Sequence, residues 1–489
     1  MARRRNPFPA LVAIALVPAV ALGGCWRFAD DRAPVAVSVP VSTNAPTTDG
    51  STPVQVPTSL ATPLLSVRRS PAVLSRDVNM AAFRTSAEAF LSHIDGTSCI
   101  SMSIDGQPVA SKNADVSLRP ASNMKLVTAA VALDVLGPGF TYTTEVRGAA
   151  QNGVVTGDLY LVGGGDPLLS SSWWKGPSTK YPPFNVTPIE ALAEHVKAAG
   201  ITHITGSVVG DASRYDDEWY APTWGKDVRF TEGGPISALL ANDSREAVDT
   251  SSNDPVVGAA KVFTEALQAA GITVDGAPKK GVTPTSTPVA ASVVSQALPA
   301  VIQEMLTTSD NNTAEMMLKE IGLAASGKGT RVAGVAALTA TLTKWGVPLD
   351  GVTLVDGSGL SDENRLTCNV LLTVLQRHSP LDPIGRALPV AAKAGGTLAD
   401  AFNGTPLAGR LLGKTGTLYN YNDGTGGKPA AKSLSGYLPL DGGGAIEFSM
   451  LLNGPQIAEQ VVYRPIWDAF AKVLESYPSG PTAARLAPR

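Results

Sequence analysis

Ser122 and Lys125 form the first of three motifs whose side chains could carry out covalent chemistry. A serine and a lysine three residues apart share one face of a helix. A serine hydroxyl is a weak nucleophile that needs an adjacent base. Lysine becomes such a base when burial and a nearby second cation lower its pKa. The motif therefore predicts that Ser122 is a nucleophile and Lys125 its base, although alone it is more often a helix cap followed by a solvated lysine.

A second copy of this pattern, at Ser172 and Lys175, shows why the spacing needs a structural context. The second copy is followed by Gly-Pro and opens no apolar helix, so we interpret it as part of a loop. Ser122 instead begins the apolar run at 121–137, which predicts a helix buried in the middle of a domain.

The second motif is Ser309-Asp310-Asn311, which lies between two stretches with helical periodicity. The Ser309 hydroxyl could relay a proton, and the Asn311 amide could hold a substrate carbonyl. The alternative is that these residues only cap a helix.

The third motif is Lys414-Thr415-Gly416-Thr417, which opens a strand-like region and contains the only Lys-Thr-Gly in the chain. Glycine lets a ligand approach the backbone of a strand closely, and lysine and threonine can bind a carboxylate. The alternative is a surface turn.

The order of the motifs raises their joint significance. Ser-x-x-Lys, Ser-Asp-Asn and Lys-Thr-Gly are the signature of penicillin-binding proteins and class A β-lactamases. Ser309 and Lys414 are 105 residues apart, which suits one domain, whereas Ser122 and Ser309 are 187 residues apart. The longer interval predicts a domain inserted between the first two motifs.

The elements that must position these motifs fall into three parts. Residues 76–147 show an amphipathic helix, a hairpin and the buried helix, and form the first part of the penicillin-binding domain. Residues 148–295 are rich in short strands and form the inserted domain. Residues 296–477 return to helices and end with two strands and a helix, which predicts an α+β fold.

Residues 1–24 have the pattern of a signal peptide, with a basic start and thirteen apolar residues at 10–22. This run is shorter than the roughly 20 residues that span a bilayer. The small-x-small sequence at 19–21 favours ordinary cleavage, whereas the sequence before Cys25 resembles a lipobox that would place a lipid on this cysteine. Either cleavage pattern predicts that the protein is exported. Membrane attachment is then expected only through a lipid or an N-terminal anchor.

The remaining ends of the chain show no pattern of a packed core. Residues 25–75 are rich in Pro, Thr and Ser and are expected to form an extended tether. Residues 478–489 are expected to be a disordered tail.

Composition excludes several functional classes. With 44% hydrophobic residues the chain can form a packed core, and its net charge of −3 gives no sign of nucleic-acid binding. Three scattered cysteines and four histidines without metal-ligand spacing predict no metal site, and we expect no cofactor. Cys99 and Cys368 could pair in an oxidising compartment or remain free thiols.

Over residues 80–475 the sequence resembles the class C low-molecular-mass penicillin-binding proteins, the D-alanyl-D-alanine carboxypeptidase/endopeptidase family. Besides the three motifs, the resemblance includes PA (120–121), DLY (158–160), GGGDP (163–167), PISA (235–238), DGSGLS (356–361), LPV (388–390), GTL (396–398) and SGY (435–437). It implies the serine β-lactamase/penicillin-binding (transpeptidase-like) fold, with a mixed sheet flanked by helices and a helical lobe.

The resemblance also implies a reaction. Ser122 would attack the penultimate D-alanine carbonyl of a peptidoglycan stem peptide while Lys125 takes its proton. Ser309 and Lys414 would pass the proton to the leaving amine, and water would release the peptide. β-Lactam antibiotics would acylate Ser122 as covalent inhibitors.

The same resemblance implies substrate contacts. Asn311 would hold the substrate amide, and Thr415 and Thr417, with Gly416 between them, would bind the terminal carboxylate. Asp216 is the expected partner of the amino group of a diamino acid in the stem.

Two alternatives remain open at this point. One is a non-catalytic cell-wall-binding scaffold, which the loss of a motif residue would favour, and none is lost. The other is a β-lactamase or esterase on the same fold. A class A β-lactamase needs a glutamate shortly after Ser-Asp-Asn, and no glutamate occurs between Ile321 and Asp362. We therefore expect slow release of a bound β-lactam.

Overall fold

The computed structural model describes the chain from residue 70 onward with short gaps. The described residues are 70–176, 180–225, 228, 232–419, 430–441 and 443–487. The expected signal peptide, Cys25 and the tether up to residue 69 lie outside them. Among the described residues, no helix has the length and apolar character needed to cross a membrane.

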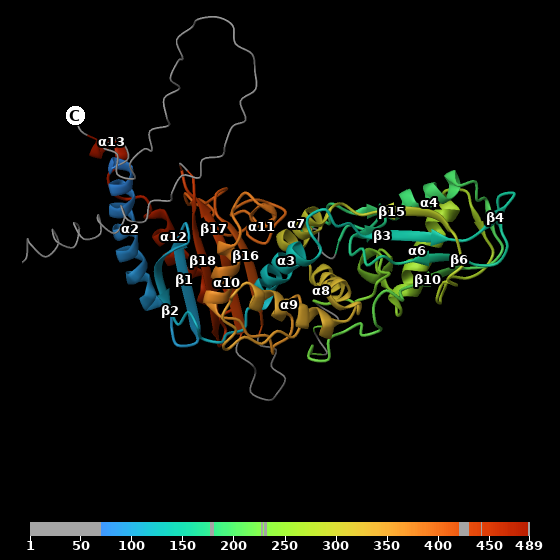
Figure 1. The fold of residues 1–489 in the computed structure, drawn as a ribbon, viewed down its shortest axis with the longest axis horizontal. Helices are drawn as coiled ribbons and strands as arrows, with labels where there is room; N and C mark the ends of the chain where they lie inside the picture. The colour runs from blue at the N-terminus through green and yellow to red at the C-terminus, as the bar shows by residue number, and fades with distance from the viewer. Residues whose placement is uncertain are drawn as a thin grey trace, which may run out of the picture. The chain divides into compact units, whose positions relative to one another are not determined.

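A five-stranded antiparallel sheet forms the centre of the penicillin-binding domain (Figure 1). Its strand order is β16 (Leu412–Leu418), β17 (Ala430–Pro439), β18 (Ala445–Gly454), β1 (Ser98–Ile104) and β2 (Gln107–Lys112). Every residue of β1 and β18 is buried. Burial of both alternating sets of side chains means that both faces of these strands are covered.

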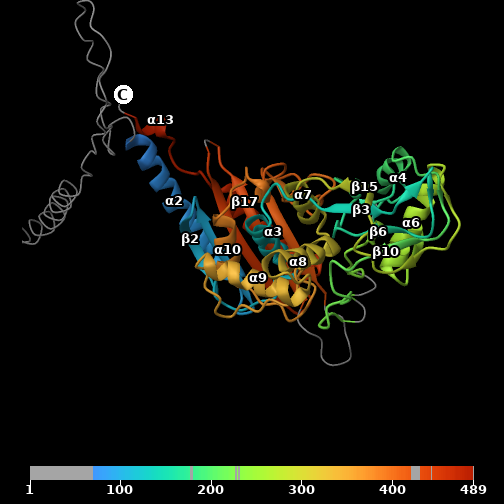
Figure 2. The ribbon, with the colours of Figure 1, turned by 45° about the vertical axis from the view of Figure 1, so that its right-hand side comes forward.

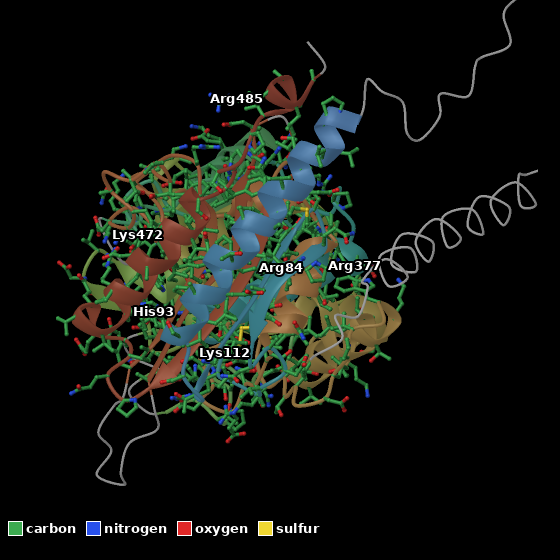
Figure 3. All side chains as sticks on the ribbon, turned by 90° about the vertical axis from the view of Figure 1, so that its left-hand side faces the viewer. Arg84, His93, Lys112, Arg377, Lys472 and Arg485 are labelled. Carbon is green, nitrogen blue, oxygen red and sulfur yellow. A yellow bond between two sulfur atoms is a disulfide. The ribbon has the colours of Figure 1, made fainter. Side chains whose placement is uncertain are left out.

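Helices cover the two faces of this sheet. On one face, α2 (Ser70–Phe90) and α12 (Gln460–Glu475) share a core with Met450 of β18. Figure 3 views this face, with α2 lying across the sheet. On the other face, α3 (Met124–Val135) and α10 (Cys368–Gln376) share a second core with Leu451. Neighbouring residues of β18 thus point into different cores, as the period of two requires.

A helical lobe surrounds the buried helix α3, whose first nine residues are all buried. Its members are α7 (Leu298–Thr308), α8 (Asn311–Ser326), α9 (Arg331–Lys344) and α11 (Pro383–Ala387). These helices belong to the same core as α3. The predicted central helix is therefore present, and its N-terminal end carries the first motif.

The strand-rich stretch between the first two motifs contains a second five-stranded sheet (Figure 2). The chain enters it through β3 and leaves it through β15, and these strands pair antiparallel, with Thr143 opposite Val294. β3 begins five residues before the expected boundary at 148. In strand order the sheet contains β14 (Lys279–Lys280), β10 (Val208–Asp211), β6 (Leu159–Val162), β3 (Thr143–Arg147) and β15 (Val289–Val294).

Smaller elements complete the described chain. The helices are α4 (Ile189–Ala198), α6 (Pro255–Ala269) and α13 (Ala483–Leu486), with short 3-10 turns η1 (Leu91–His93), η2 (Ala121–Asn123) and η3 (Asn242–Ser244). The short strands are β4 (Ala150–Gln151), β5 (Val154–Val155), β7 (Leu169–Ser170), β8 (Thr187–Pro188), β9 (His203–Ile204), β11 (Arg245–Ala247), β12 (Thr250–Ser251) and β13 (Thr273–Val274).

One segment of the inserted stretch packs on the helical lobe. Tyr215 and Trp224 form a small core with Met316 of α8 and with Leu360. The Trp224 indole N–H donates to Asp356 over 2.9 Å. A few residues further on, the Glu232 carbonyl oxygen accepts from the Asn311 side chain, so the inserted stretch reaches the second motif.

The two expected unstructured ends differ from the structure where it describes them. Helix α2 begins at Ser70, inside the expected tether, and the tail packs along this helix as α13. The Ser75 hydroxyl donates to the Pro481 carbonyl over 2.7 Å, and the Asn79 side chain accepts from Gly480 N–H. These hydrogen bonds satisfy backbone groups of the tail, which composition alone does not reveal.

Cys99 of β1 and Cys368 of α10 form a disulfide. The sequence left this pairing open. The bond connects the central sheet to the helix that covers it and joins residues 269 positions apart.

Replacing Cys99 and Cys368 together by serine is expected to lower the free energy of unfolding by about 2–4 kcal/mol, because the crosslink restricts the unfolded chain. Urea unfolding under oxidising conditions measures this change. Cys25→Ser is the matched control and is expected to keep the wild-type midpoint. An unchanged midpoint in the double variant would contradict the structural role of the disulfide.

Candidate active site

The first motif lies where the 3-10 turn η2 leads into α3. Ala121 has a backbone φ of 48°, in the left-handed region that non-glycine residues rarely adopt. In the first turn of α3, Lys125 Nζ lies 3.1 Å from Ser122 Oγ. The same nitrogen lies 2.5 Å from Asn311 Oδ1 and 2.8 Å from the Ser358 carbonyl oxygen. The three donors of an ammonium group are thus matched by three acceptors.

Burial makes Lys125 a potential base. Its side chain is completely buried, and removal from water lowers its pKa to about 8 against the opposing attraction of Glu315 and Asp310. A neutral amine is therefore accessible near physiological pH, in contact with the Ser122 hydroxyl.

The second motif is a tight reversal between α7 and α8. Ser309 has a φ of 71° and ends α7, and Asp310 accepts the Thr313 N–H over 2.7 Å and caps α8. The helix-cap interpretation thus holds for Asp310. The same turn directs Ser309 to Lys414 of the third motif and Asn311 to Lys125 of the first, so it both caps α8 and positions these two side chains.

The third motif places a second buried lysine beside Ser309. Lys414 Nζ, on β16, lies 2.8 Å from Ser309 Oγ and 2.8 Å from the Thr415 carbonyl oxygen. Burial, and then the positive charges of Lys125 and Lys432, hold its pKa well below the ordinary value. A second amine suited to proton transfer thus lies in the site.

Gly416 lets strand β16 approach the nucleophile. A side-chain carbon at this position would lie 2.2 Å from Ser433 Oγ and 2.9 Å from Ser122 N, so only glycine fits. The Asn123 amide holds this arrangement together, because it donates to the Lys414 carbonyl over 3.0 Å and to Ser433 Oγ over 2.7 Å.

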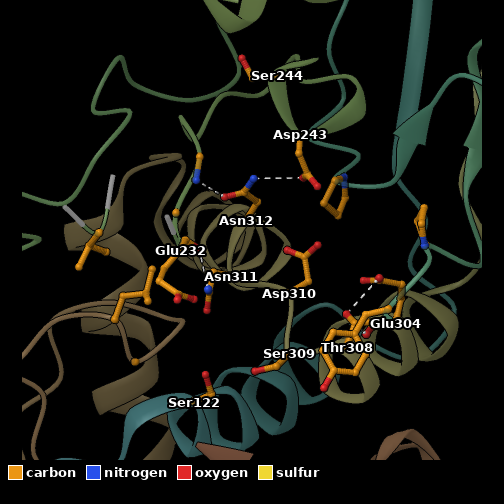
Figure 4. Close-up of a pocket in the computed structure, with 18 of the residues that line it drawn as sticks. Ser122, Glu232, Asp243, Ser244, Glu304, Thr308, Ser309, Asp310, Asn311 and Asn312 are labelled. Atoms are coloured by element: carbon orange, nitrogen blue, oxygen red, sulfur yellow. Dashed lines mark hydrogen bonds between the residues drawn. The ribbon is translucent and has the colours of Figure 1, made fainter. Parts of the chain in front are cut away.

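All three motifs open into one cavity of about 810 Å³. Figure 4 shows its side with the first two motifs, where Ser122, Ser309 and Asn311 lie. Motif residues in its wall are Ser122, Ser309, Asp310, Asn311, Thr415, Gly416 and Thr417. Lys125 and Lys414 lie buried behind this wall. The inserted stretch adds Trp174, Tyr220, Glu232 and Asp243. The cavity therefore needs both the penicillin-binding domain and the insertion.

Carboxyl groups gather beyond Ser309 in this cavity (Figure 4). Burial and the charge of Asp310 raise the pKa of Asp243 to about 7 and that of Glu304 well above its usual range. Burial also raises the pKa of Asp310. Among the described residues, no group of three or more His, Cys, Asp and Glu side chains is arranged to hold a metal ion. This side of the cavity is acidic, whereas the β16 side contains the lysines.

The structure does not bring Asp216 to the cavity wall. Its carboxylate lies 2.6 Å from Lys319 Nζ, and the Lys319 side chain is only 3% exposed. A buried ammonium needs a counter-ion, so this ion pair gives Asp216 a structural role.

The site also contains residues to which the sequence analysis assigned no role, although Thr397 lies in the GTL pattern at 396–398. Thr397 Oγ1 lies 2.8 Å from Thr415 Oγ1, and Lys432 Nζ lies 2.8 Å from Thr417 Oγ1. Glu232 accepts from the Asn311 amide through its backbone carbonyl over 2.7 Å. Lys432 could have been found only from the pairing register of β17 with β16, which the local sequence does not reveal.

The second Ser-x-x-Lys copy shows no comparable contact. Lys175 Nζ donates to the carbonyl oxygen of Ser172 over 2.8 Å, and both side chains are exposed. This is the geometry of a surface turn, as expected for a loop.

Comparison with known proteins decides the family. The model of the D-Ala-D-Ala carboxypeptidase 3 (S13) family matches residues 95–255 and 244–477. The chain belongs to this family. A carboxypeptidase of Mycobacterium tuberculosis is 31% identical over 372 residues, covering 72% of this chain and 75% of the relative. A D-alanyl-D-alanine carboxypeptidase of Actinomadura sp. (strain R39) is 29% identical over 438 residues, covering 71% of this chain and 76% of the relative.

Solved structures support the same fold. Penicillin binding protein 4 (dacB) from Haemophilus influenzae superposes with a TM-score of 0.63 at 19% identity, covering 79% of this chain and 99% of that protein. The expected α+β penicillin-binding fold is confirmed. Membership of the S13 family confirms the expected class of enzyme, a serine-type hydrolase.

Gly416→Ala is expected to slow acylation of Ser122 about a hundredfold or more, because the added carbon displaces β16. With the strand moves the Thr417 backbone N–H, which together with that of Ser122 would stabilise the negative charge on the attacked carbonyl oxygen. The rate of labelling by a fluorescent penicillin measures this effect.

Gly413→Ala on the same strand is the matched control for Gly416→Ala. There the nearest atoms to an added carbon are leucine methyl groups 3.0 Å and 3.5 Å away, which can adjust. Equal labelling rates in both variants would show that the close approach of Gly416 does not matter.

The acylation rate of Ser122 is expected to rise about tenfold per pH unit below pH 8 and to level off above it. The reason is that Lys125 can accept a proton only when neutral, and its pKa is about 8. Stopped-flow labelling between pH 6 and 9.5 measures this profile. A rate that is constant over this range would rule out Lys125 as the base.

Proposed function

We propose that this chain is an exported serine D-alanyl-D-alanine carboxypeptidase, endopeptidase or both, which acts on peptidoglycan stem peptides through an acyl-enzyme on Ser122. One observation carries the proposal. Ser122 with Lys125, and Ser309 with Lys414, meet at a single cavity although the first and last of these residues are 292 positions apart. The family and its named carboxypeptidases support the same chemistry.

Acylation begins when Ser122 Oγ attacks the carbonyl carbon of the penultimate D-alanine. Its proton moves to the neutral Lys125 amine, 3.1 Å away. The negative charge that develops on the carbonyl oxygen is stabilised by the backbone N–H groups of Ser122 and Thr417. One such donor is typically worth a factor of about 10²–10³ in rate.

The leaving amine then needs a proton as its bond to the carbonyl carbon breaks. The proton that Lys125 accepted reaches the leaving amine through the contact between Ser309 Oγ and Lys414 Nζ, and Lys125 is neutral again. Water next attacks the ester carbonyl carbon and gives one proton to a site amine. The bond from that carbon to Ser122 Oγ then breaks, the amine returns the proton to Oγ, and the shortened peptide is released. Atoms and charge balance over the cycle, and no cofactor takes part.

Substrate contacts follow from the same wall of the cavity. Asn311 presents its amide to the substrate, and the hydroxyls of Thr415 and Thr417 bind the terminal carboxylate. Asp216 has no part in this proposal because it pairs with Lys319 away from the cavity wall.

The proposed location follows from the substrate. Peptidoglycan lies outside the cytoplasmic membrane, in agreement with the export signal predicted at residues 1–24. We place the enzyme at the cell wall or in the periplasm, with a lipid at Cys25 as its proposed attachment. β-Lactams are the proposed covalent inhibitors, and the H. influenzae relative has a solved complex with a β-lactam.

Fluorescent penicillin is expected to label the wild-type protein stably and to leave Ser122→Ala unlabelled, because Ser122 is the proposed nucleophile, with the Lys125 amine 3.1 Å away as its base. Ser172→Ala is the matched control from the second Ser-x-x-Lys copy and is expected to label fully. Gel fluorescence after denaturation measures the label. A protein that never labels, and that releases no product from stem peptides, would instead be a wall-binding scaffold.

β-Lactam turnover is the second candidate function, and Glu232 is the observation that favours it. This residue lies in the cavity, and burial raises the pKa of its carboxyl group. The same labelling experiment decides between the two functions through the lifetime of the label. A label lost within minutes in the wild type but retained in Glu232→Gln would identify a lactamase.

Digestion of purified wall peptides distinguishes carboxypeptidase activity from endopeptidase activity. Mass spectrometry of products from a linear stem pentapeptide and from a crosslinked dimer shows whether terminal D-alanine, the crosslink or both are cleaved.

A further inference from the structure

Lys432 is a third lysine at the site, and neither the motifs nor the proposed reaction uses it. It lies on β17 directly opposite Thr417 of β16. Its Nζ donates to Thr417 Oγ1 over 2.8 Å, and it lines the cavity although its side chain is largely buried. Its ammonium group therefore lies beside a hydroxyl proposed to bind the substrate carboxylate.

Two aromatic rings of α12 fix this ammonium group in position. Nζ lies 4.4 Å from the centre of the Tyr463 ring and 5.3 Å from the centre of the Trp467 ring. The rings themselves pack edge to face, with centres 4.8 Å apart. Cation–π contacts of this kind orient a lysine without neutralising its charge.

The charge of Lys432 has no carboxylate partner within salt-bridge distance among the described residues. Burial and then the positive charge of Arg464 lower the pKa of Lys432 to about 8, and Lys432 in turn lowers the pKa of Lys414. A buried cation is costly unless it is paired. The positive potential at this end of the cavity thus lacks the anion that would balance it.

We propose that Lys432 binds the carboxylate of the substrate together with Thr417, and so makes the enzyme selective for peptides whose leaving amine carries a carboxylate on its α-carbon. This inference rests on the proposed function. It assigns specificity to an ammonium group on the neighbouring strand, in addition to the hydroxyls of the third motif. Terminal D-alanine and a crosslinked amino acid with a free α-carboxylate both satisfy the requirement.

A purely structural role for Lys432 makes a different prediction. If the ammonium group only holds Thr417 and α12 in place, its loss slows every substrate to the same degree. Binding of a carboxylate instead changes the ratio between a charged substrate and its neutral analogue. This ratio is therefore the quantity to measure.

The experiment compares N-acyl-D-Ala-D-Ala with N-acyl-D-Ala-D-alaninamide, which lacks only the negative charge. We expect wild-type kcat/KM to favour the carboxylate substrate by about 10- to 100-fold, the value of a charge-assisted hydrogen bond. In Lys432→Met the preference is expected to fall below about threefold. Lys432→Arg keeps the positive charge and is expected to retain most of the wild-type preference for the carboxylate substrate.

Lys472→Met is the matched control, because it removes an exposed positive charge from α12. It is expected to keep the wild-type preference. Lys432→Gln, which can still donate to Thr417, is the second variant if the methionine variant does not fold, and its preference is also expected to fall below about threefold.

An equal loss on both substrates in the folded Lys432 variants would overturn the inference and leave the proposed function intact. A wild-type protein that hydrolyses neither peptide and takes no penicillin label would overturn the proposed function itself, and the inference with it.

Discussion

The burial of two lysine amines behind one cavity wall is the constraint on which the site depends. Lys125 and Lys414 are both completely shielded from solvent. Removal from water disfavours the ammonium form of both, and the charge of Lys125 lowers the pKa of Lys414 further. Each amine instead contacts a serine hydroxyl. The buried first nine residues of helix α3 and the buried residues 413–416 of the edge strand β16 supply this environment.

Local sequence predicted the parts of the site that depend on local geometry. The i and i+3 spacing of Ser122 and Lys125, the turn at Ser309 and the strand at Lys414 are each contained in a few residues, and the structure brings them together. Asp216 was assigned from the family resemblance, and the sequence could not show that a buried Lys319 takes its carboxylate. Lys432 depends on strand register, and Glu232 on how the insertion packs, and both are properties of the folded chain.

The same distinction applies to the fold. Periodicity predicted the buried helix, the inserted strands and the closing strand pair, because each repeats a pattern within one element. The ordered tail was not predicted, because its hydrogen bonds come from Ser75 and Asn79, about 400 residues earlier in the chain. The disulfide between Cys99 and Cys368 likewise depends on the spatial proximity of β1 and α10.

The paired strands β3 and β15 connect the insertion to the penicillin-binding domain, and they determine how the insertion can vary in length. Because β3 and β15 run side by side, the insertion begins and ends at nearly the same point in space. Its outer sheet can therefore grow, shrink or be exchanged during evolution without changing the separation of Ser122 from Ser309. The exception is the segment around Tyr215 and Trp224, which covers Met316 and Leu360. A descendant that lost this segment would expose apolar surface of α8, the helix that follows the turn at Ser309. The segment around Tyr215 and Trp224 is therefore the part of the insertion that the fold must keep.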